Sequence, residues 1–262
     1  MMKKVCIIGI GLIGGSLAKA IKKTHQSEIV FGFGRDRTRL EKAQKGNVID
    51  QYSTDIGEAL DGANMVIIAT PVGSYESILK EMKPHIAEDM VISDVGSTKV
   101  SVIEAVKAVF DGALDNFIPA HPIAGKEKSG FEVSGADLFV NKKVVITPLE
   151  NNNPESIKML TKMWKGVGAE VDFMTPQSHD DLLGMTSHLP HMLAFSLVNY
   201  LISQHPEASV YAAGGFKDFS RIASGDAIMW RDICLHNRDA IVAHIKGYQE
   251  SLNVLVDAID SQ

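Results

Sequence analysis

Cysteine is scarce in this chain of 262 residues, which has only Cys6 and Cys234. Neither lies in a CxxC pair or a zinc-type spacing, so no disulfide framework or cysteine-based metal site is indicated. Long hydrophobic runs are also missing: the stretch VCIIGIG after the N-terminal MMKK is too short for a membrane span. No signal-peptide cleavage pattern follows it. We therefore expect a cytoplasmic protein with no membrane partner.

The chain also lacks an excess of basic charge. It has 26 Lys and Arg against 32 Asp and Glu, which gives a formal net charge of −6. A nucleic-acid-binding protein would carry a basic face, so we expect no nucleic-acid partner. The apolar share of 45% and the charged share of 22% are ordinary for a globular protein.

What the chain does contain is an alternation of short apolar runs with helical patterns. Apolar runs separated by amphipathic helices predict a doubly wound α/β sheet, covered on both faces. The pattern predicts a dinucleotide-binding Rossmann-type domain over 1–175. The strands are expected at 4–10, 28–34, 65–71, 90–96, 117–122, 143–148 and 169–174.

After Pro176 the pattern changes to long helical stretches without a convincing strand. We therefore expect an all-helical domain over 176–262. A segment of this size is small for an independent core. We expect it to pack against a second copy of itself and to make the protein a homodimer.

A glycine loop follows the first predicted strand and opens a helix. Gly9, Gly11 and Gly14 form GxGxxG, which in this context is typical of dinucleotide binding. Gly9 permits the turn, Gly11 lets the backbone approach a pyrophosphate, and Gly14 lets the helix pack on the strand. The phosphates then lie at the helix N-terminus, where Leu12 and Ile13 begin the helix.

The end of the second strand bears on the choice between NAD and NADP. An acidic residue there would bind the ribose of NAD, but this chain has Gly34 followed by Arg35. Since arginine pairs with phosphate, Arg35 favours NADP. Two alternatives stay open: Asp36 could be the ribose ligand, or Arg35, Arg37 and Arg39 could be a solvated basic turn.

Ligands of open α/β sheets bind beyond the carboxyl ends of the strands. Thr70 and Pro71 follow the third predicted strand and are expected under the nicotinamide. Ser97 and His121 follow neighbouring strands and could hydrogen-bond each other, which would make His121 a general base. The alternative for His121 is a buried structural histidine at a proline turn.

The helical half supplies a second group of candidates. His188 and His191 stand at the start of an apolar helix and are expected to bind a substrate carboxylate. A metal at this HxxH is not expected, since no third ligand motif accompanies it. Lys217 and Arg221 would share a helix face and offer two cations to an anionic substrate; a surface charge cluster is the alternative.

Six motifs occur in the order GIGLIGGS, DVGSTK, HPIAGKEKSG, LGMTSHLPH, KDFSRIAS and MWRDI. Together they resemble the prephenate/arogenate dehydrogenases of tyrosine biosynthesis, and the resemblance covers essentially the whole chain. It implies an NAD(P)-dependent oxidative decarboxylation, in which hydride leaves C4 of a cyclohexadiene ring and the ring carboxylate leaves as CO2. It also implies a dimer formed by the helical domain.

The resemblance assigns roles to single residues. His121 would accept the proton of the 4-hydroxyl, and Ser97 would orient His121 near the nicotinamide. Arg221 would bind a substrate carboxylate, and His191 would position the substrate side chain. Lys217 and Glu127 match residues that pair at the mouth of the active site.

Two other functions compete with this one. A non-catalytic NADP-binding sensor would keep the glycine loop but would need neither His121 nor Arg221. A β-hydroxyacid dehydrogenase would typically carry a lysine on the first long helix after the boundary, where this chain has SHLPHMLAF. Prephenate and arogenate are not separated by any residue of the sequence.

Overall fold

The computed structural model describes residues 1–112, 114–126, 128–211 and 213–261. It divides into two units, Met1–His179 and Asp180–Gln262, whose boundary lies within helix α7 (Pro176–Leu183). The predicted boundary near residue 175 precedes this division by a few residues. Glu127, to which the resemblance assigns a place at the active-site mouth, lies outside the described residues.

The first unit is built on a six-stranded sheet in the order β3-β2-β1-β4-β5-β6, in which all neighbouring strands are parallel. Ile8 at the end of β1 pairs with both Phe33 and Ile68, so the neighbouring strands end at the same edge. The strand order reverses between β1 and β4, where ligands of doubly wound sheets bind. The strands are β1 (Met2–Ile8), β2 (Ser27–Phe33), β3 (Gln51–Ser53), β4 (Met65–Ile68), β5 (Val91–Asp94) and β6 (Phe117–Ile118).

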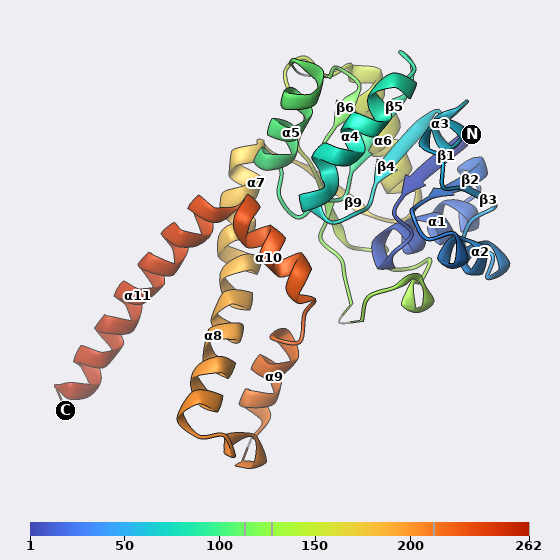
Figure 1. Ribbon diagram of the computed structural model, residues 1–262. Coiled ribbons are helices and arrows are strands. Elements are labelled where there is room, and N and C mark those ends of the chain that lie inside the picture. Colours follow the sequence, from blue (N-terminus) through green and yellow to red (C-terminus); the bar gives the residue numbers. More distant parts are fainter. Residues whose placement is uncertain (113, 127, 212, 262) are drawn as a thin grey trace. The chain divides into compact units, whose positions relative to one another are not determined.

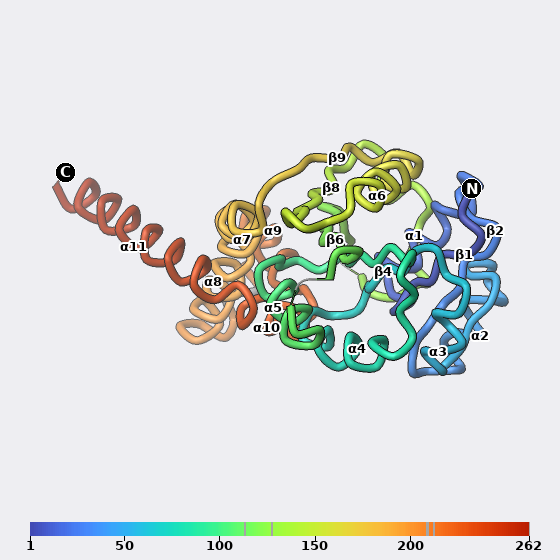
Figure 2. The backbone as a smooth tube through the Cα atoms, turned by 90° about the horizontal axis from the view of Figure 1, so that it is seen from above, coloured from blue at the N-terminus to red at the C-terminus, as the bar shows by residue number. Residues whose placement is uncertain are grey.

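Helices cover both faces of this sheet because alternate strand residues are apolar on both sides. Val5 and Ile7 of β1 pack on one face, and Cys6 and Ile8 pack on the other. The first face meets α1 (Leu12–Lys23), α2 (Arg37–Lys45) and α6 (Pro154–Gly166). The second meets α3 (Ile56–Leu60), α4 (Tyr75–Met82) and α5 (Val100–Phe110), as Figures 1 and 2 show. The predicted fold class is confirmed.

A second sheet of three strands differs from the expectation of one continuous doubly wound sheet. The strand expected at 117–122 is interrupted at Pro119: β6 ends before it, and β7 (Ala120–Pro122) begins after it. β7 pairs antiparallel with β8 (Lys143–Ile146), and β8 pairs parallel with β9 (Glu170–Phe173). Proline has no N–H for a strand ladder, so the chain leaves the first sheet directly before His121.

The second unit is helical. It consists of the end of α7 and of α8 (Leu189–Gln204), α9 (Gly214–Ile222), α10 (Ala227–His236) and α11 (Arg238–Asp260), with a π-helical turn at Gly184–His188. Its buried cluster is small and centres on Trp230, Ile233 and Ile241. Among the described helices, none is long and apolar enough to cross a membrane.

The C-terminal half of α11 extends away from α8, α9 and α10 (Figure 1). Exposed apolar side chains lie there, and Leu255 at 55% and Ile259 at 64% relative accessibility share one helix face. An apolar helix face of this kind is typical of a protein–protein interface.

Candidate active site

The glycine loop lies at the switch point between β1 and β4. Gly9 has a φ of 97°, in the region that favours glycine, and its N–H donates to Phe33 O at 2.9 Å. A Cβ at Gly14 would lie 2.1 Å from Gly9 O, so this position requires glycine for helix packing. A Cβ at Gly11 would meet no atom within 4 Å. The open space over Gly11 and the start of α1 fits a dinucleotide pyrophosphate.

The segment after β4 adjoins this loop. A Cβ at Gly9 would lie 2.8 Å from Cγ2 of Thr70, so the two turns are in close contact. The Thr70 Oγ1 accepts a hydrogen bond from the Ser74 hydroxyl at 2.9 Å. Thr70 and Pro71 thus border the glycine loop, at the place predicted for the nicotinamide.

The three arginines in and after the turn that follows β2 have different contacts. Asp36 is the N-cap of α2, and its carboxylate accepts a hydrogen bond from Arg39 N at 3.1 Å. Arg37 pairs with Glu41 at 3.3 Å. The Arg39 guanidinium lies 6.0 Å from the centre of the Phe131 ring. Arg35 is exposed.

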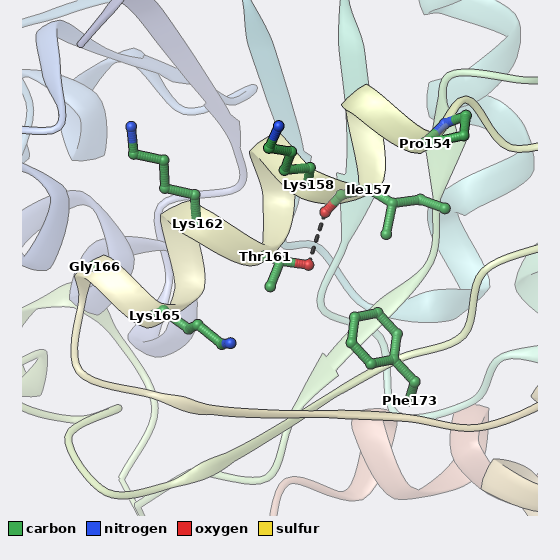
Figure 3. A pocket seen from close by; sticks show the side chains of 8 residues that line it. All are labelled: Pro154, Ile157, Lys158, Thr161, Lys162, Lys165, Gly166 and Phe173. Carbon is green, nitrogen blue, oxygen red and sulfur yellow. Dashed lines mark hydrogen bonds between the residues drawn. The ribbon is translucent and has the colours of Figure 1, made fainter.

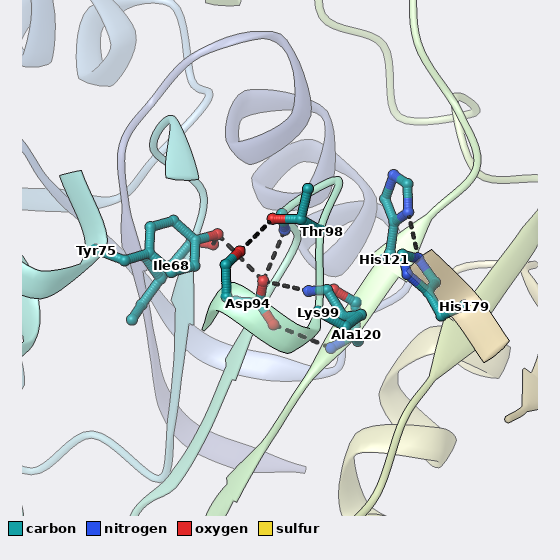
Figure 4. Close-up of polar contacts among 10 residues, drawn as sticks. Ile68, Tyr75, Asp94, Thr98, Lys99, Ala120, His121 and His179 are labelled. Atoms are coloured by element: carbon teal, nitrogen blue, oxygen red, sulfur yellow. Dashed lines mark hydrogen bonds and ion pairs between the residues drawn. The ribbon is translucent and has the colours of Figure 1, made fainter. Parts of the chain in front are cut away.

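A buried carboxylate, Asp94 at the end of β5, organises the sheet edge (Figure 4). Asp94 and Lys99 are both 0% exposed, and their charged groups form an ion pair. The same carboxylate accepts hydrogen bonds from Gly96 N at 2.8 Å and from Ala120 N at 3.1 Å. Lys99 Nζ also donates to Ala120 O at 2.7 Å. Ser97 follows Gly96 and His121 follows Ala120, so this network fixes the backbone beside both predicted catalytic residues.

Tyr75 of α4 completes the contacts of Asp94. Its hydroxyl donates to Asp94 Oδ2 at 3.2 Å. Burial, helped by the negative charge of Asp94, raises the pKa of Tyr75 well above its ordinary value. The phenol therefore keeps its proton and remains a hydrogen-bond donor.

The His121 ring has a partner that was not predicted from the sequence. Its Nδ1 lies 2.8 Å from Nε2 of His179, a residue of α7 that is 0% exposed. The ring centres are 5.0 Å apart, at an interplanar angle of 66°. His121 is half-buried in β7, and Ser97 is half-buried in the loop after β5.

In the helical unit, His188 and His191 have different surroundings. His188 is 1% exposed, and its Nδ1 lies 3.0 Å from Nδ2 of Asn237. The His191 ring stacks on Trp230 at 3.8 Å, and its Nδ1 donates to Ser187 O at 2.8 Å. Burial lowers the pKa of His191, although the hydrogen bond to Ser187 acts in the opposite direction. Near neutral pH the ring is therefore uncharged, and Nε2 is its accepting nitrogen.

Lys217 and Arg221 both lie on α9, so the expected i, i+4 spacing is present on a helix. Both are exposed. The Arg221 Nε lies 3.9 Å from Asp218 Oδ1, a distance at which an exposed ion pair contributes little to stability.

A surface hollow elsewhere on the first unit lies between α6 and β9 (Figure 3). None of the site residues predicted from the sequence lines it. Its lining residues are Pro154, Ile157, Lys158, Thr161, Lys162, Lys165, Gly166 and Phe173.

Comparisons with known proteins identify the class to which this fold and site belong. Residues 17–173 match the nucleotide-binding domain of prephenate dehydrogenase, and residues 175–262 match its dimerization domain. The chain therefore belongs to the prephenate dehydrogenase family. It is an oxidoreductase that uses NAD(P) for an oxidative decarboxylation in tyrosine biosynthesis.

Particular relatives cover most of the chain. It is 37% identical to prephenate dehydrogenase of Bacillus subtilis over 246 residues, which is 92% of this chain and 66% of that protein. It is 31% identical to cyclohexadienyl dehydrogenase of Zymomonas mobilis, with 100% of this chain and 90% of that protein covered.

Among solved structures, prephenate dehydrogenase from Aquifex aeolicus in complex with hydroxyphenyl propionate and NAD+ is similar. The TM-score is 0.94 and the identity 36%, over 100% of this chain and 92% of that one. The family resemblance stated from the sequence motifs is confirmed. The dimerization-domain match supports a homodimer.

The two loop glycines should respond differently to a Cβ. Gly14→Ala forces its methyl against Gly9 O and should lower the free energy of unfolding by about 1–3 kcal/mol. Gly11→Ala should change it by about 1 kcal/mol or less, yet weaken dinucleotide binding about tenfold or more. Urea denaturation and fluorescence titration with the reduced dinucleotide measure the two effects. Equal losses of stability in the two variants would contradict a packing role for Gly14 and a ligand-binding role for Gly11.

Removing the ammonium of Lys99, the cation of the buried Asp94–Lys99 pair, should strongly destabilise the fold. Lys99→Met leaves the Asp94 charge buried without its ammonium, and should lower the free energy of unfolding by about 3–5 kcal/mol. Lys80→Met is the matched control, because the Lys80–Glu76 pair is exposed and should contribute about 0–1 kcal/mol. Similar urea midpoints for the two variants would show that the buried pair has no special importance.

Proposed function

We propose that the protein oxidises and decarboxylates prephenate or arogenate with His121 as the general base, and that NADP is its preferred cofactor. One observation supports the base assignment above the others. His121 lies beyond the carboxyl end of β6. The residue before it, Ala120, donates its N–H to the carboxylate of Asp94 at the end of β5. This is the sheet edge at which the glycine loop also lies.

In the proposed reaction, His121 accepts the proton of the substrate 4-hydroxyl as the C4–H bond breaks. The hydride leaves C4 with its electron pair, and a bound nicotinamide would supply the acceptor for it. The bond between C1 and the ring carboxylate then breaks, CO2 leaves, and its electron pair completes the aromatic ring. His121 returns its proton to the C4 oxygen, which ends as a phenol. A neutral histidine is suited to both transfers.

Residues of the helical unit are proposed to bind the rest of the substrate. Arg221 offers a planar guanidinium fork to a carboxylate, and Lys217 adds a second cation on the same helix. His191 is proposed to contact the substrate side chain. The same contact predicted for His188 does not fit its burial, because that residue is only 1% exposed. Neutral His191, with Nδ1–H directed at Ser187 O, offers Nε2 as an acceptor for a donor group.

Three features of the turn after β2 support the preference for NADP. Gly34 supplies no carboxylate that would repel a 2′-phosphate. Asp36 is engaged as the N-cap of α2, which weakens the alternative that it binds the ribose. Arg35 is exposed and lies two residues after the end of the strand. Ser97 is proposed to orient His121, and the protein is proposed to work in the cytoplasm as a homodimer.

The direct test is an assay of four combinations: prephenate and arogenate, each with NAD and with NADP. Reduction of the nicotinamide is followed by its near-ultraviolet absorbance. Turnover with at least one acid supports the proposal, and the fastest pair identifies the preferred substrate and cofactor. NADP binding without turnover of either acid would instead favour the non-catalytic sensor.

The base assignment predicts a selective loss. His121→Asn should lower kcat by about 10²–10⁴-fold, because the 4-hydroxyl loses its proton acceptor. Dinucleotide affinity should stay near that of the wild type, since the glycine loop lies on β1 and α1. Steady-state kinetics and dinucleotide titration measure both quantities, and unchanged kcat would remove His121 as the base.

Cofactor preference should depend on Arg35. Arg35→Ala removes a charged hydrogen-bond donor worth about 1.5–3 kcal/mol, so NADP affinity should fall roughly 10- to 100-fold. NAD affinity should change little, since NAD has no 2′-phosphate. Arg37→Ala is the matched control, because Arg37 is paired with Glu41. Equal weakening of NAD and NADP by Arg35→Ala would refute the preference.

A further inference from the structure

The contact between His121 and His179 restricts where protons can be. Two ring nitrogens 2.8 Å apart form a hydrogen bond only if one carries a hydrogen and the other has a lone pair. Figure 4 shows the rings with these nitrogens facing each other. The bridge between Nδ1 of His121 and Nε2 of His179 therefore holds one proton.

The location of this proton decides which nitrogen of His121 is basic. If Nδ1 of His121 carries it, the neutral ring has its lone pair on Nε2, on the side away from His179. If His179 carries it on Nε2, neutral His121 has its hydrogen on Nε2 and no lone pair there. Only the first arrangement leaves Nε2 of His121 able to accept a proton from a substrate hydroxyl.

We propose that His179 is a positioning residue that accepts the Nδ1–H of His121 and so keeps Nε2 of His121 as the basic nitrogen. This inference rests on the proposed function of His121. When His121 takes up the substrate proton, its Nδ1–H donates from a cation, and the hydrogen bond to His179 strengthens. An acceptor on the second nitrogen is a general means of fixing the tautomer of a catalytic histidine.

The surroundings of His179 suit this role. Its side chain is 0% exposed, so bulk water does not compete for the Nδ1–H of His121. It lies on α7, whereas His121 lies on β7, so two separate elements hold the rings at this distance. The backbone on the other side of His121 is fixed through Ala120, whose N–H donates to Asp94.

Two substitutions of His179 show whether its role is to accept the hydrogen bond from His121 or only to fill space beside that ring. His179→Gln keeps a polar amide near the place of Nε2 and can accept the hydrogen bond. His179→Met has a similar reach but no comparable acceptor. We expect His179→Met to lower kcat about 10- to 100-fold with little change in KM, and His179→Gln to retain most of the wild-type kcat. A loss in His179→Gln as large as in His179→Met would overturn the proposal.

Nitrogen NMR of histidine-labelled full-length protein provides a readout that does not depend on turnover. The His121 signals are assigned by their disappearance in His121→Asn. In wild type and in His179→Gln, the His121 ring should be protonated on Nδ1 and unprotonated on Nε2. In His179→Met, it should shift toward the Nε2–H tautomer. A wild-type ring protonated on Nε2, or an unchanged tautomer in His179→Met, would overturn the inference.

The two failures are distinguishable. If wild type turns over no substrate pair yet shows the Nδ1–H tautomer, the proposed function fails and the hydrogen bond stands. If wild type turns over substrate but has the Nε2–H tautomer, the role of His179 fails alone. Should circular dichroism show that His179→Met does not fold, the wild-type tautomer and the kcat of His179→Gln still decide the matter.

Discussion

The carboxylate of Asp94 holds together the part of the molecule where chemistry is expected. It accepts hydrogen bonds from Gly96 N, Ala120 N and the Tyr75 hydroxyl, and it pairs with the ammonium of Lys99. A buried carboxylate is costly unless its charge and lone pairs are satisfied, and here both conditions are met. Because its donors come from separate segments, one side chain sets the relative positions of the loops after β5 and β6.

The break in the sheet at Pro119 makes this arrangement possible. If β6 continued as a strand, the backbone of Ala120 would form hydrogen bonds within the first sheet. The chain instead turns into β7, and Ala120 N is bonded to Asp94. His121 thereby lies in β7 of the second sheet instead of the first, and it meets His179 of α7. The glycine loop, two strands from β5, depends on none of these contacts.

Much of this architecture could be predicted from the sequence because it follows from local patterns. The alternation of apolar runs with amphipathic helices predicted the doubly wound sheet, and Gly9, Gly11 and Gly14 predicted the dinucleotide loop. Ser97 and His121 were placed at neighbouring strand ends by the order of the motifs.

The features that could not be predicted depend on contacts between distant residues. His179 stands in PQSHDD, which has no spacing relation to His121, and only the fold brings the two together. Asp94 did carry a signal, as a carboxylate ending the apolar run MVIS, but its four donors lie at positions that sequence alone does not relate. The separate sheet β7-β8-β9 was missed because Val144 and Ile146 are as apolar as residues of a central strand.

The Asp94–Lys99 pair should align the sheet edge that carries Ser97 and His121, and turnover of the double variant Asp94→Asn, Lys99→Met measures this effect. Both charges are removed together, so no unpaired buried charge remains. We expect dinucleotide affinity to stay near wild type while kcat falls about 100-fold, as a displacement of about 1 Å at a reacting group can cause. A wild-type kcat in this folded variant would show that the pair does not align Ser97 and His121 for turnover.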